Sequence, residues 1–214
     1  MAKQDPIVFV VDDDPTIRRS LKWLVESVGL KVEGYASGQE FLAAYDPSTP
    51  GCLVLDLRMP GLSGLDIQER LAEKEATLPI IMITAHGEVE TAVQSMRAGA
   101  FDFINKPFSK QLLLDRIQQA LSHDAEERRL QAERVVLQER LASLSGRERE
   151  VMDLVVAGRS NREAAEALGI SAKTVEFHRA RLMEKLAVDS LADLVRLAVR
   201  MECHQERESK PGPQ

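Results

Sequence analysis

The stretch LVLDLRMPGLSG, residues Leu53–Gly64, is the most informative about the fold, because in it an apolar run typical of a buried strand stops at a carboxylate. Three apolar residues lead into Asp56, and the chain turns soon afterwards at Pro60-Gly61. Buried strands rarely end on an unpaired carboxylate, since desolvating a charge without a partner is unfavourable. Asp56 therefore has either a local role, capping the turn through its side chain, or a chemical one.

Further apolar runs flank this stretch in the first 122 residues and alternate with helix-like segments. They cover 7–11, 79–84, 101–104 and, more weakly, 31–34. Helix start signals stand between them, such as Asp14 before Pro15 and Ser37 three residues before Glu40. Five strands alternating with five helices predict an α/β domain with a parallel, doubly wound sheet covered on both faces. The functional crevice of such a sheet lies beyond the carboxyl ends of its strands.

Polar residues follow several of these strands, so the fold would gather them at one edge. Asp12 and Asp13 follow the first strand, Asp56 and Thr84 end two others, and Lys106 follows the last. Three carboxylates in one crevice repel each other and require a cation. Mg²⁺ fits, because it accepts a few carboxylates and keeps waters. The set suits phosphoryl transfer to Asp56, with Mg²⁺ and Lys106 neutralising the transferred oxygens and Thr84 adding a hydroxyl.

This set closely resembles the receiver domain of two-component response regulators, on the motifs Asp12-Asp13, Asp56, Thr84, Lys106-Pro107 and RMPGLSG. The resemblance implies a flavodoxin-like receiver over residues 1–122 and a sensor histidine kinase as phosphoryl donor to Asp56. It also implies metal ligation by Asp13, Asp56 and the Arg58 backbone carbonyl, with Asp12 acting mainly through water.

The resemblance further implies that Phe103, three residues before Lys106, forms a switch pair with Thr84. On pattern alone, Phe103 reads equally well as strand core. A rival class, the aspartyl-phosphate hydrolases of the haloacid dehalogenase type, needs a second Asp two residues after the nucleophile. Arg58 stands at that position. We therefore expect no enzyme but a regulatory protein, which accepts a phosphoryl group on Asp56 and loses it slowly.

Residues 123–143, HDAEERRLQAERVVLQERLAS, contain no Gly or Pro and predict a helical linker that could continue the helix before it. Its apolar stripe consists of Leu130, Leu137, Leu141 and Leu144. Two interpretations stay open, an amphipathic spacer and a coiled coil. Glu133 and Arg140 argue against the coiled coil, because they fall on the second core position of its heptad. The polar, Pro- and Gly-containing tail, 202–214, is predicted to be disordered.

Residues 144–201 predict an all-α domain of four short helices. The segment SNREAAEALGISAKTVEFHRARLMEKL has helix-turn-helix spacing, with Gly169 at the turn and Ser171 capping the second helix. On a helical wheel Val175, Leu182 and Leu186 share one side and would be buried. The residues predicted to contact DNA are Lys173, Thr174, Glu176, Phe177, His178, Arg179, Ala180 and Arg181.

An exposed Phe177 suits a major groove, where it can contact thymine methyl groups, and Glu176 could accept from cytosine N4. Lys173, Arg179 and Arg181 are placed for phosphates, which give affinity without sequence preference. The alternative is a partner-binding four-helix domain with a solvated basic helix. The segment LSGREREVMDLVVAGRSNREAAEALGISAKTVEFHRARLMEKL is similar to the LuxR/FixJ/NarL DNA-binding domain over its whole length. Within that family, the first-domain segments TAHGEVETAVQSMRAGAFDFINKPF and LRMPGLSG are most similar to the FixJ-like branch.

The charge distribution permits DNA binding although the chain as a whole has a net charge of −6. Residues 1–122 hold 12 Lys and Arg against 17 Asp and Glu, whereas residues 144–201 hold 10 against 9. DNA affinity must therefore come from local geometry in the second domain. Two Cys, four scattered His and no membrane-length apolar run predict a reduced, cytosolic protein without structural zinc or membrane contact.

The two resemblances together imply a transcription factor that phosphorylation controls. The implied partners are a histidine kinase, double-stranded promoter DNA and RNA polymerase. Val89, Val93 and Met96 form an apolar stripe at helical spacing after Thr84, which predicts a symmetric homodimer on phosphorylation. A receiver joined to a protein-interaction module without DNA binding is the alternative.

Overall fold

The computed structural model describes residues 5–74, 76–85 and 89–208. The chain forms two compact units, and the boundary between them falls after Leu130. No helix in the described part of the chain is long and apolar enough to span a membrane.

The first unit is built on a five-stranded parallel sheet, as predicted. Its strands are β1 (Ile7–Val11), β2 (Lys31–Tyr35), β3 (Gly51–Asp56), β4 (Ile80–Thr84) and β5 (Asp102–Asn105). Their order across the sheet is β2-β1-β3-β4-β5. This is the flavodoxin-like arrangement, in which the order of the strands reverses beside β1 and β3. The sheet therefore has its functional crevice at the end of β3 that carries Asp56.

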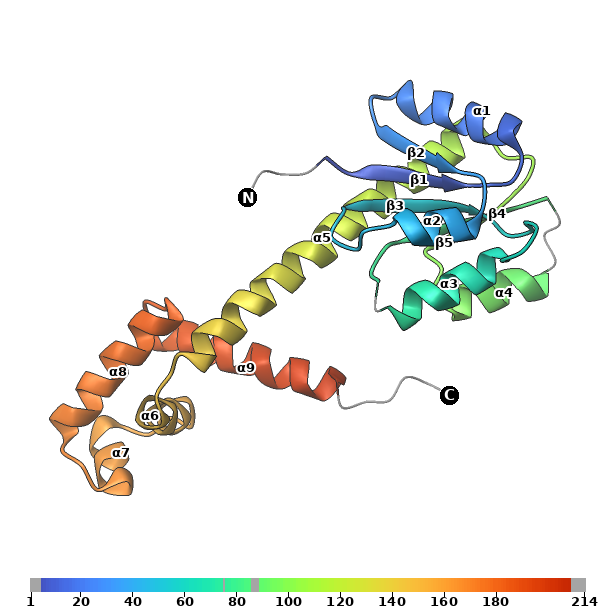
Figure 1. The fold of residues 1–214 in the computed structure, drawn as a ribbon. Helices are drawn as coiled ribbons and strands as arrows, with labels where there is room; N and C mark the ends of the chain where they lie inside the picture. The colour runs from blue at the N-terminus through green and yellow to red at the C-terminus, as the bar shows by residue number, and fades with distance from the viewer. Residues whose placement is uncertain (1–4, 75, 86–88, 209–214) are drawn as a thin grey trace. The chain divides into compact units, whose positions relative to one another are not determined.

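Helices cover both faces of this sheet (Figure 1). They are α1 (Pro15–Glu26), α2 (Gly38–Ala44), α3 (Gly64–Glu73), α4 (Val89–Arg97) and α5 (Lys110–Ala142). Alternate strand residues belong to two hydrophobic cores, one on each face of the sheet. Val8 and Val54 pack with α1 and α5 on one face. Phe9 and Leu55 pack with α2 and α3 on the other. Because both faces of the sheet are covered, β3 and β4 are buried at every residue, and their apolar residues form continuous runs instead of alternating with polar ones.

The last helix of the sheet domain, α5, continues through the predicted linker without a break. A pair formed by the buried Asp124 and the half-buried Arg128 connects it to the loop before β3. The Arg128 Nε lies 2.9 Å from each carboxylate oxygen of Asp124, and its other nitrogens donate to three carbonyls of residues 47–49 at 2.8–3.1 Å. Asp124, only 1% exposed, also accepts from the Gly51 amide at 2.9 Å. The segment predicted to be a helical linker therefore begins as part of the first unit.

The second unit contains the four predicted helices, α6 (Gly146–Val156), α7 (Asn161–Leu168), α8 (Ala172–Leu186) and α9 (Leu191–Glu208). Gly169 ends α7 in the left-handed conformation, and Ser171 caps α8. The expected disorder from residue 202 is wrong for 202–208, because α9 continues to Glu208. The reason is that Glu, Gln and Arg are good helix formers, and no Gly or Pro occurs before Pro211. Residues 209–214 of the predicted tail lie outside the described residues.

Candidate functional site

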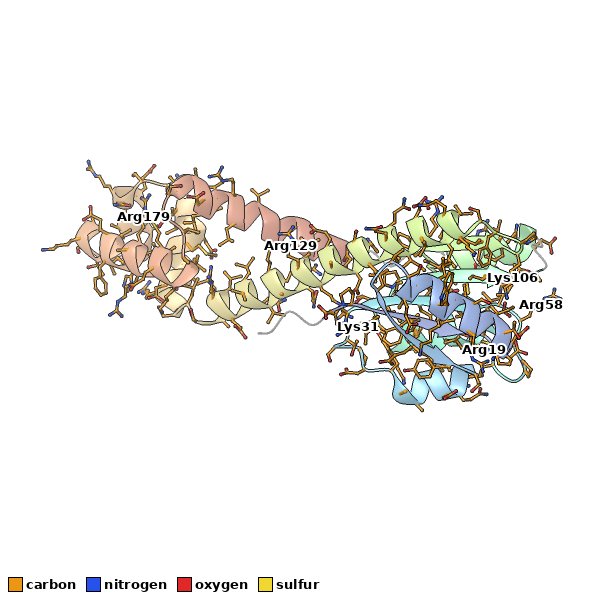
Figure 2. The ribbon with its side chains drawn as sticks, turned by 90° about the horizontal axis from the view of Figure 1, so that it is seen from above. Arg19, Lys31, Arg58, Lys106, Arg129 and Arg179 are labelled. Carbon is orange, nitrogen blue, oxygen red and sulfur yellow. The ribbon has the colours of Figure 1, made fainter. Side chains whose placement is uncertain are left out.

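Parallel strands bring four of the predicted site residues to one edge of the sheet. Asp12 follows β1, Asp56 ends β3 and Thr84 ends β4, and these strands are neighbours in the order β1, β3, β4. Lys106 follows β5, and its amide donates to the Thr84 carbonyl at 2.7 Å. Figure 2 shows Lys106 at this end of the sheet and Lys31, the first residue of β2, at the other.

The Lys106 ammonium bridges two of these carboxylates. Its Nζ lies 2.7 Å from Asp56 Oδ1 and 3.0 Å from Asp12 Oδ2. Both acids are buried, with Asp56 8% and Asp12 3% exposed. The remaining Asp56 oxygen accepts from the Arg58 amide at 3.0 Å. The carboxylate that ends β3 is therefore held in a fixed orientation by charge-assisted hydrogen bonds.

Burial and ion pairing have opposite effects on the pKa of each charged group at this site. Burial raises the pKa of Asp56 above its ordinary value, although the contact with Lys106 counteracts it. Burial also lowers the pKa of Lys106, but its hydrogen bonds to Asp56 and Asp12 prevail and the net pKa is raised. Lys106 therefore stays protonated at neutral pH and neutralises one of the two carboxylates.

The donor set suits a divalent cation by charge and by ligand type. Asp12 and Asp56 share one ammonium, so their pair keeps one negative charge, and the exposed carboxylate of Asp13 adds another. Within the described residues, no group of three Asp, Glu, His or Cys side chains is close enough together to hold a metal ion by itself. That arrangement fits Mg²⁺, which takes one or two carboxylates and keeps several waters, and it does not fit a metal that needs a complete protein cage.

The loop after Asp56 is shaped so that α3 begins directly against the end of β3. A Cβ on Gly64 would lie 2.8 Å from the Asp56 carbonyl oxygen, closer than a side chain allows. Ser63 caps α3 by accepting from the Asp66 amide, and Gly61 has a φ of +86°, which glycine adopts readily. These requirements explain the glycines and the serine in the sequence PGLSG, residues 60–64, after the strand.

The two residues of the predicted switch pair lie on neighbouring strands. Thr84 is 1% exposed at the end of β4, and Phe103 on β5 is paired in register with Met82. Phe103 is half-buried and packs against the core that contains Phe9 and Leu55. This packing agrees with the strand-core interpretation, and the switch role stays a prediction.

A second candidate site lies on α8, the second helix of the helix-turn-helix. Val175, Leu182 and Leu186 are buried, as the helical wheel predicted. Phe177 on the other side is 55% exposed, and the Arg181 guanidinium lies 5.0 Å from the centroid of its ring. The other predicted contact residues that are exposed are Lys173, Glu176 and Ala180. This face is therefore open and combines cationic, acidic and aromatic groups.

Three of the predicted contact residues on α8 are half-buried, namely Thr174, His178 and Arg179. The Thr174 hydroxyl lies 2.7 Å from that of the N-cap Ser171. Arg179, labelled in Figure 2, donates to Asn161 Oδ1 at the start of α7 at 3.2 Å. Arg179 therefore links the two helices of the motif, which leaves only part of its guanidinium for another ligand.

Comparison with known proteins identifies both units. The model of the response regulator receiver domain matches residues 8–118, and the model of bacterial regulatory proteins of the luxR family matches residues 142–198. The chain belongs to the response regulators. Its second unit is a LuxR-type DNA-binding domain, so this response regulator is a transcriptional regulator. The receiver and LuxR-type resemblances inferred from the motifs are thereby confirmed.

Full-length relatives place this response regulator in the FixJ-like branch. It is 45% identical to the transcriptional regulatory protein TdiR of Thauera aromatica, over 92% of this chain and 87% of the relative. It is 42% identical to FixJ of Azorhizobium caulinodans, over 90% and 91%. The response regulator StyR superimposes with a TM-score of 0.86 at 44% identity, covering 92% and 99%. Full-length FixJ from B. japonicum gives 0.58 at 39%, covering 92% and 98%.

Sequence reasoning missed two groups that support the receiver of this response regulator. Arg18 binds the backbone next to the acidic residues, and Asp124 with Arg128 joins α5 to the loop before β3. The sequence does contain a signal for the Arg18 contact. Arg18 lies one turn after the Asp14 cap, and helical side chains lean toward the N-terminus, so its side chain is directed back to the preceding loop. Asp124 and Arg128 are four residues apart on a charged helix, a spacing that also occurs on solvated surfaces.

Proposed function

We propose that this response regulator is switched by phosphorylation of Asp56 and thereby controls the binding of its LuxR-type domain to promoter DNA. The observation that carries the proposal is the Lys106 bridge to Asp56 and Asp12 at the carboxyl edge of the sheet. It combines a fixed, buried carboxylate with a cation beside it, which is what a nucleophile for a phosphoryl group requires.

In the proposed reaction an Asp56 carboxylate oxygen attacks the phosphorus of a phosphohistidine on a sensor kinase. The new O–P bond makes an acyl phosphate, and the P–N bond breaks with its electron pair returning to the imidazole, which is then protonated. Lys106, 2.7 Å from Asp56 Oδ1, neutralises charge on the transferred group. Thr84 at the end of β4 offers a hydroxyl to the product.

Asp13, Asp56 and the Arg58 carbonyl would hold Mg²⁺, with Asp12 acting through water. When bound, the ion supplies charge neutralisation for the phosphoryl oxygens. The proposal rests on the charge balance of the site, which leaves the carboxylates in excess over Lys106.

Acetyl phosphate with Mg²⁺ tests the phosphoacceptor directly. The wild-type chain should gain one phosphoryl group by intact mass, and Asp56→Asn should gain none, because the nucleophile is gone. Asp66→Asn is a matched control, since Asp66 is an exposed acid that caps α3. Full labelling of Asp56→Asn would overturn the assignment.

The DNA-binding face of α8 is tested by comparing Lys173→Ala with Phe177→Ala on operator and random DNA. Lys173→Ala should weaken both about equally and reduce the salt slope by roughly one, as for a phosphate contact. Phe177→Ala should cost about 1–3 kcal/mol on the operator and little on random DNA. Lys173 is the better phosphate variant, because Arg181 also covers the Phe177 ring.

The alternative, a protein-interaction module without DNA binding, predicts no mobility shift with any promoter fragment. The names of TdiR and FixJ as transcriptional regulatory proteins favour DNA binding instead. The exposure of Phe177 on the same open helix face as Lys173 and Arg181 points in the same direction. On DNA, RNA polymerase would be the further partner.

A further inference from the structure

Arg18 makes an unusual contact beside the acidic site, because it binds main-chain oxygens while carboxylates lie close by. Its Nη1 donates to the Asp12 carbonyl at 2.7 Å and to the Asp13 carbonyl at 2.9 Å. The side chain is half-buried. One guanidinium nitrogen therefore fixes two successive peptide groups of the loop between β1 and α1.

The start of α1 explains why Arg18 reaches this loop. Asp14 caps the helix by accepting from the Thr16 amide at 2.7 Å, and Pro15 occupies its first position. The Arg18 amide donates to the Asp14 carbonyl at 3.1 Å, which places Arg18 one turn into the helix. Helical side chains lean toward the N-terminus, so this one is directed back to the loop.

A continuous series of hydrogen bonds leads from Arg18 to Asp56. Arg18 holds the Asp12 carbonyl, and the Asp14 amide holds Asp12 Oδ1 at 2.9 Å. Lys106 then joins Asp12 Oδ2 at 3.0 Å to Asp56 Oδ1 at 2.7 Å. The orientation of Asp12, and through it that of Lys106, therefore depends on a backbone position that Arg18 restrains.

We propose that Arg18 is a positioning residue for the phosphoacceptor site, acting on the main chain of Asp12 and Asp13. The proposal rests on the proposed phosphorylation of Asp56. A guanidinium paired with the carboxylates would neutralise them and compete with a cation. Bound to carbonyl oxygens, Arg18 orders the acidic loop and leaves the carboxylates available.

Two possible roles of Arg18, one through its positive charge and one through positioning the loop, predict opposite changes in Mg²⁺ affinity when Arg18 is removed. If Arg18 acted only through its positive charge, its loss would make the site more negative and tighten Mg²⁺ binding. If it positions the loop, its loss disorders Asp12 and Asp13 and weakens Mg²⁺ binding. The sign of the change therefore separates the two roles.

The experiment compares Arg18→Met with Arg19→Met in the full-length chain. Met keeps most of the apolar stem and removes the charged head. Arg19 is a matched control, because it is the next residue of α1, carries the same charge and is exposed. Its hydrogen bond within the described part of the chain goes to the Pro15 carbonyl of its own helix. Three quantities are measured: the initial labelling rate with acetyl phosphate at saturating Mg²⁺, the Mg²⁺ dissociation constant by calorimetry, and amide hydrogen exchange of residues 12–14.

We expect Arg18→Met to label roughly ten-fold or more slowly at saturating Mg²⁺, since a misplacement of about 1 Å can reduce a rate by up to about 100-fold. We expect it to bind Mg²⁺ several-fold more weakly and to exchange the amides of residues 12–14 faster. Arg19→Met should stay within about two-fold of the wild type in each measurement.

Tighter Mg²⁺ binding by Arg18→Met, or behaviour equal to that of Arg19→Met, would overturn the positioning role. A wild-type chain that acetyl phosphate does not label would instead overturn the proposed function, and this inference with it. If Arg18→Met does not fold, Arg18→Lys against Arg19→Lys replaces the pair. The shorter ammonium cannot reproduce the guanidinium geometry, so a smaller slowing in the same direction is expected.

Discussion

Asp56 illustrates, for a single residue, how burying a carboxylate opposes stability. Burial raises the pKa of its carboxyl, and the contact with Lys106 only partly offsets this effect. With a higher pKa in the folded state, the folded protein binds more protons than the unfolded chain between the two pKa values. The contribution of Asp56 to stability therefore falls as the pH rises through the folded-state pKa, and it is least favourable at neutral pH.

We accordingly expect Asp56→Asn to raise the free energy of unfolding at pH 7 by about 0.5–2 kcal/mol. Asn retains an acceptor for Lys106 and removes the buried charge. Urea denaturation of the full-length chain checks this, and the gain should shrink as the pH is lowered toward about 4. A variant less stable than the wild type at pH 7 would show that the Lys106 pair outweighs burial.

Helix α5 illustrates, for a single element, how an ion pair with a buried acid determines where a domain ends. Asp124 and Arg128 lie beyond the residues that match the receiver family, yet they bind the main chain on both sides of Pro50. The side chain of Asp124 is only 2% exposed. Removing its partner would leave a buried, uncompensated charge, which is strongly unfavourable.

Arg128→Ala should therefore lower the free energy of unfolding of the receiver by about 3–5 kcal/mol. Arg129→Ala is the matched control: its ion pair with Glu126 is more than half exposed on both sides, so the loss should stay below about 1 kcal/mol. Urea denaturation curves of both variants measure these losses in the free energy of unfolding. Faster exchange of the Gly51 amide, which donates to Asp124, should accompany the Arg128 effect. Equal losses in the two variants would contradict this account.

One chain combines a receiver with a LuxR-type DNA-binding domain, so under the proposed function the two domains must communicate through a change of state. On α4, Val93 is 43% and Met96 is 45% exposed, and both belong to the predicted dimer stripe. The side chain of Val89, the third member, lies outside the described residues. An exposed apolar surface on the element that follows Thr84 suits pairing with a second copy.

Phosphorylation should shift the chain from mostly monomer to mostly dimer, which requires a bias of a few kcal/mol toward the paired state. Sedimentation of labelled wild type, Asp56→Asn and Val93→Asp tests this. Val93→Asp should be labelled normally and stay monomeric, because it places a charge in the apolar contact. The dimer should prefer two half-sites about one helical turn apart. Equal dimer fractions and operator affinities in all three would exclude control through dimerisation.

Local sequence patterns are sufficient to predict the elements and the edge of the sheet at which the candidate site lies. Apolar runs and capping residues identified the strands and helices, and a parallel sheet must bring Asp12, Asp56 and Thr84 to one edge. The helical wheel likewise identified the buried side of α8. These predictions succeeded because each depends on local periodicity, or on a topological rule that does not need exact distances.

Contacts between groups that are far apart in the chain could not be predicted and are visible only in the folded protein. Lys106 meets Asp12 at a separation of 94 residues, and Asp124 meets the Gly51 amide at 73. No local pattern distinguishes a buried Asp124 from a solvated one, because both occur on a charged helix at the same spacing from Arg. Burial and hydrogen-bond partners are properties of the packed chain, so the anchored start of the linker and the restraint by Arg18 emerge only once the elements are in place.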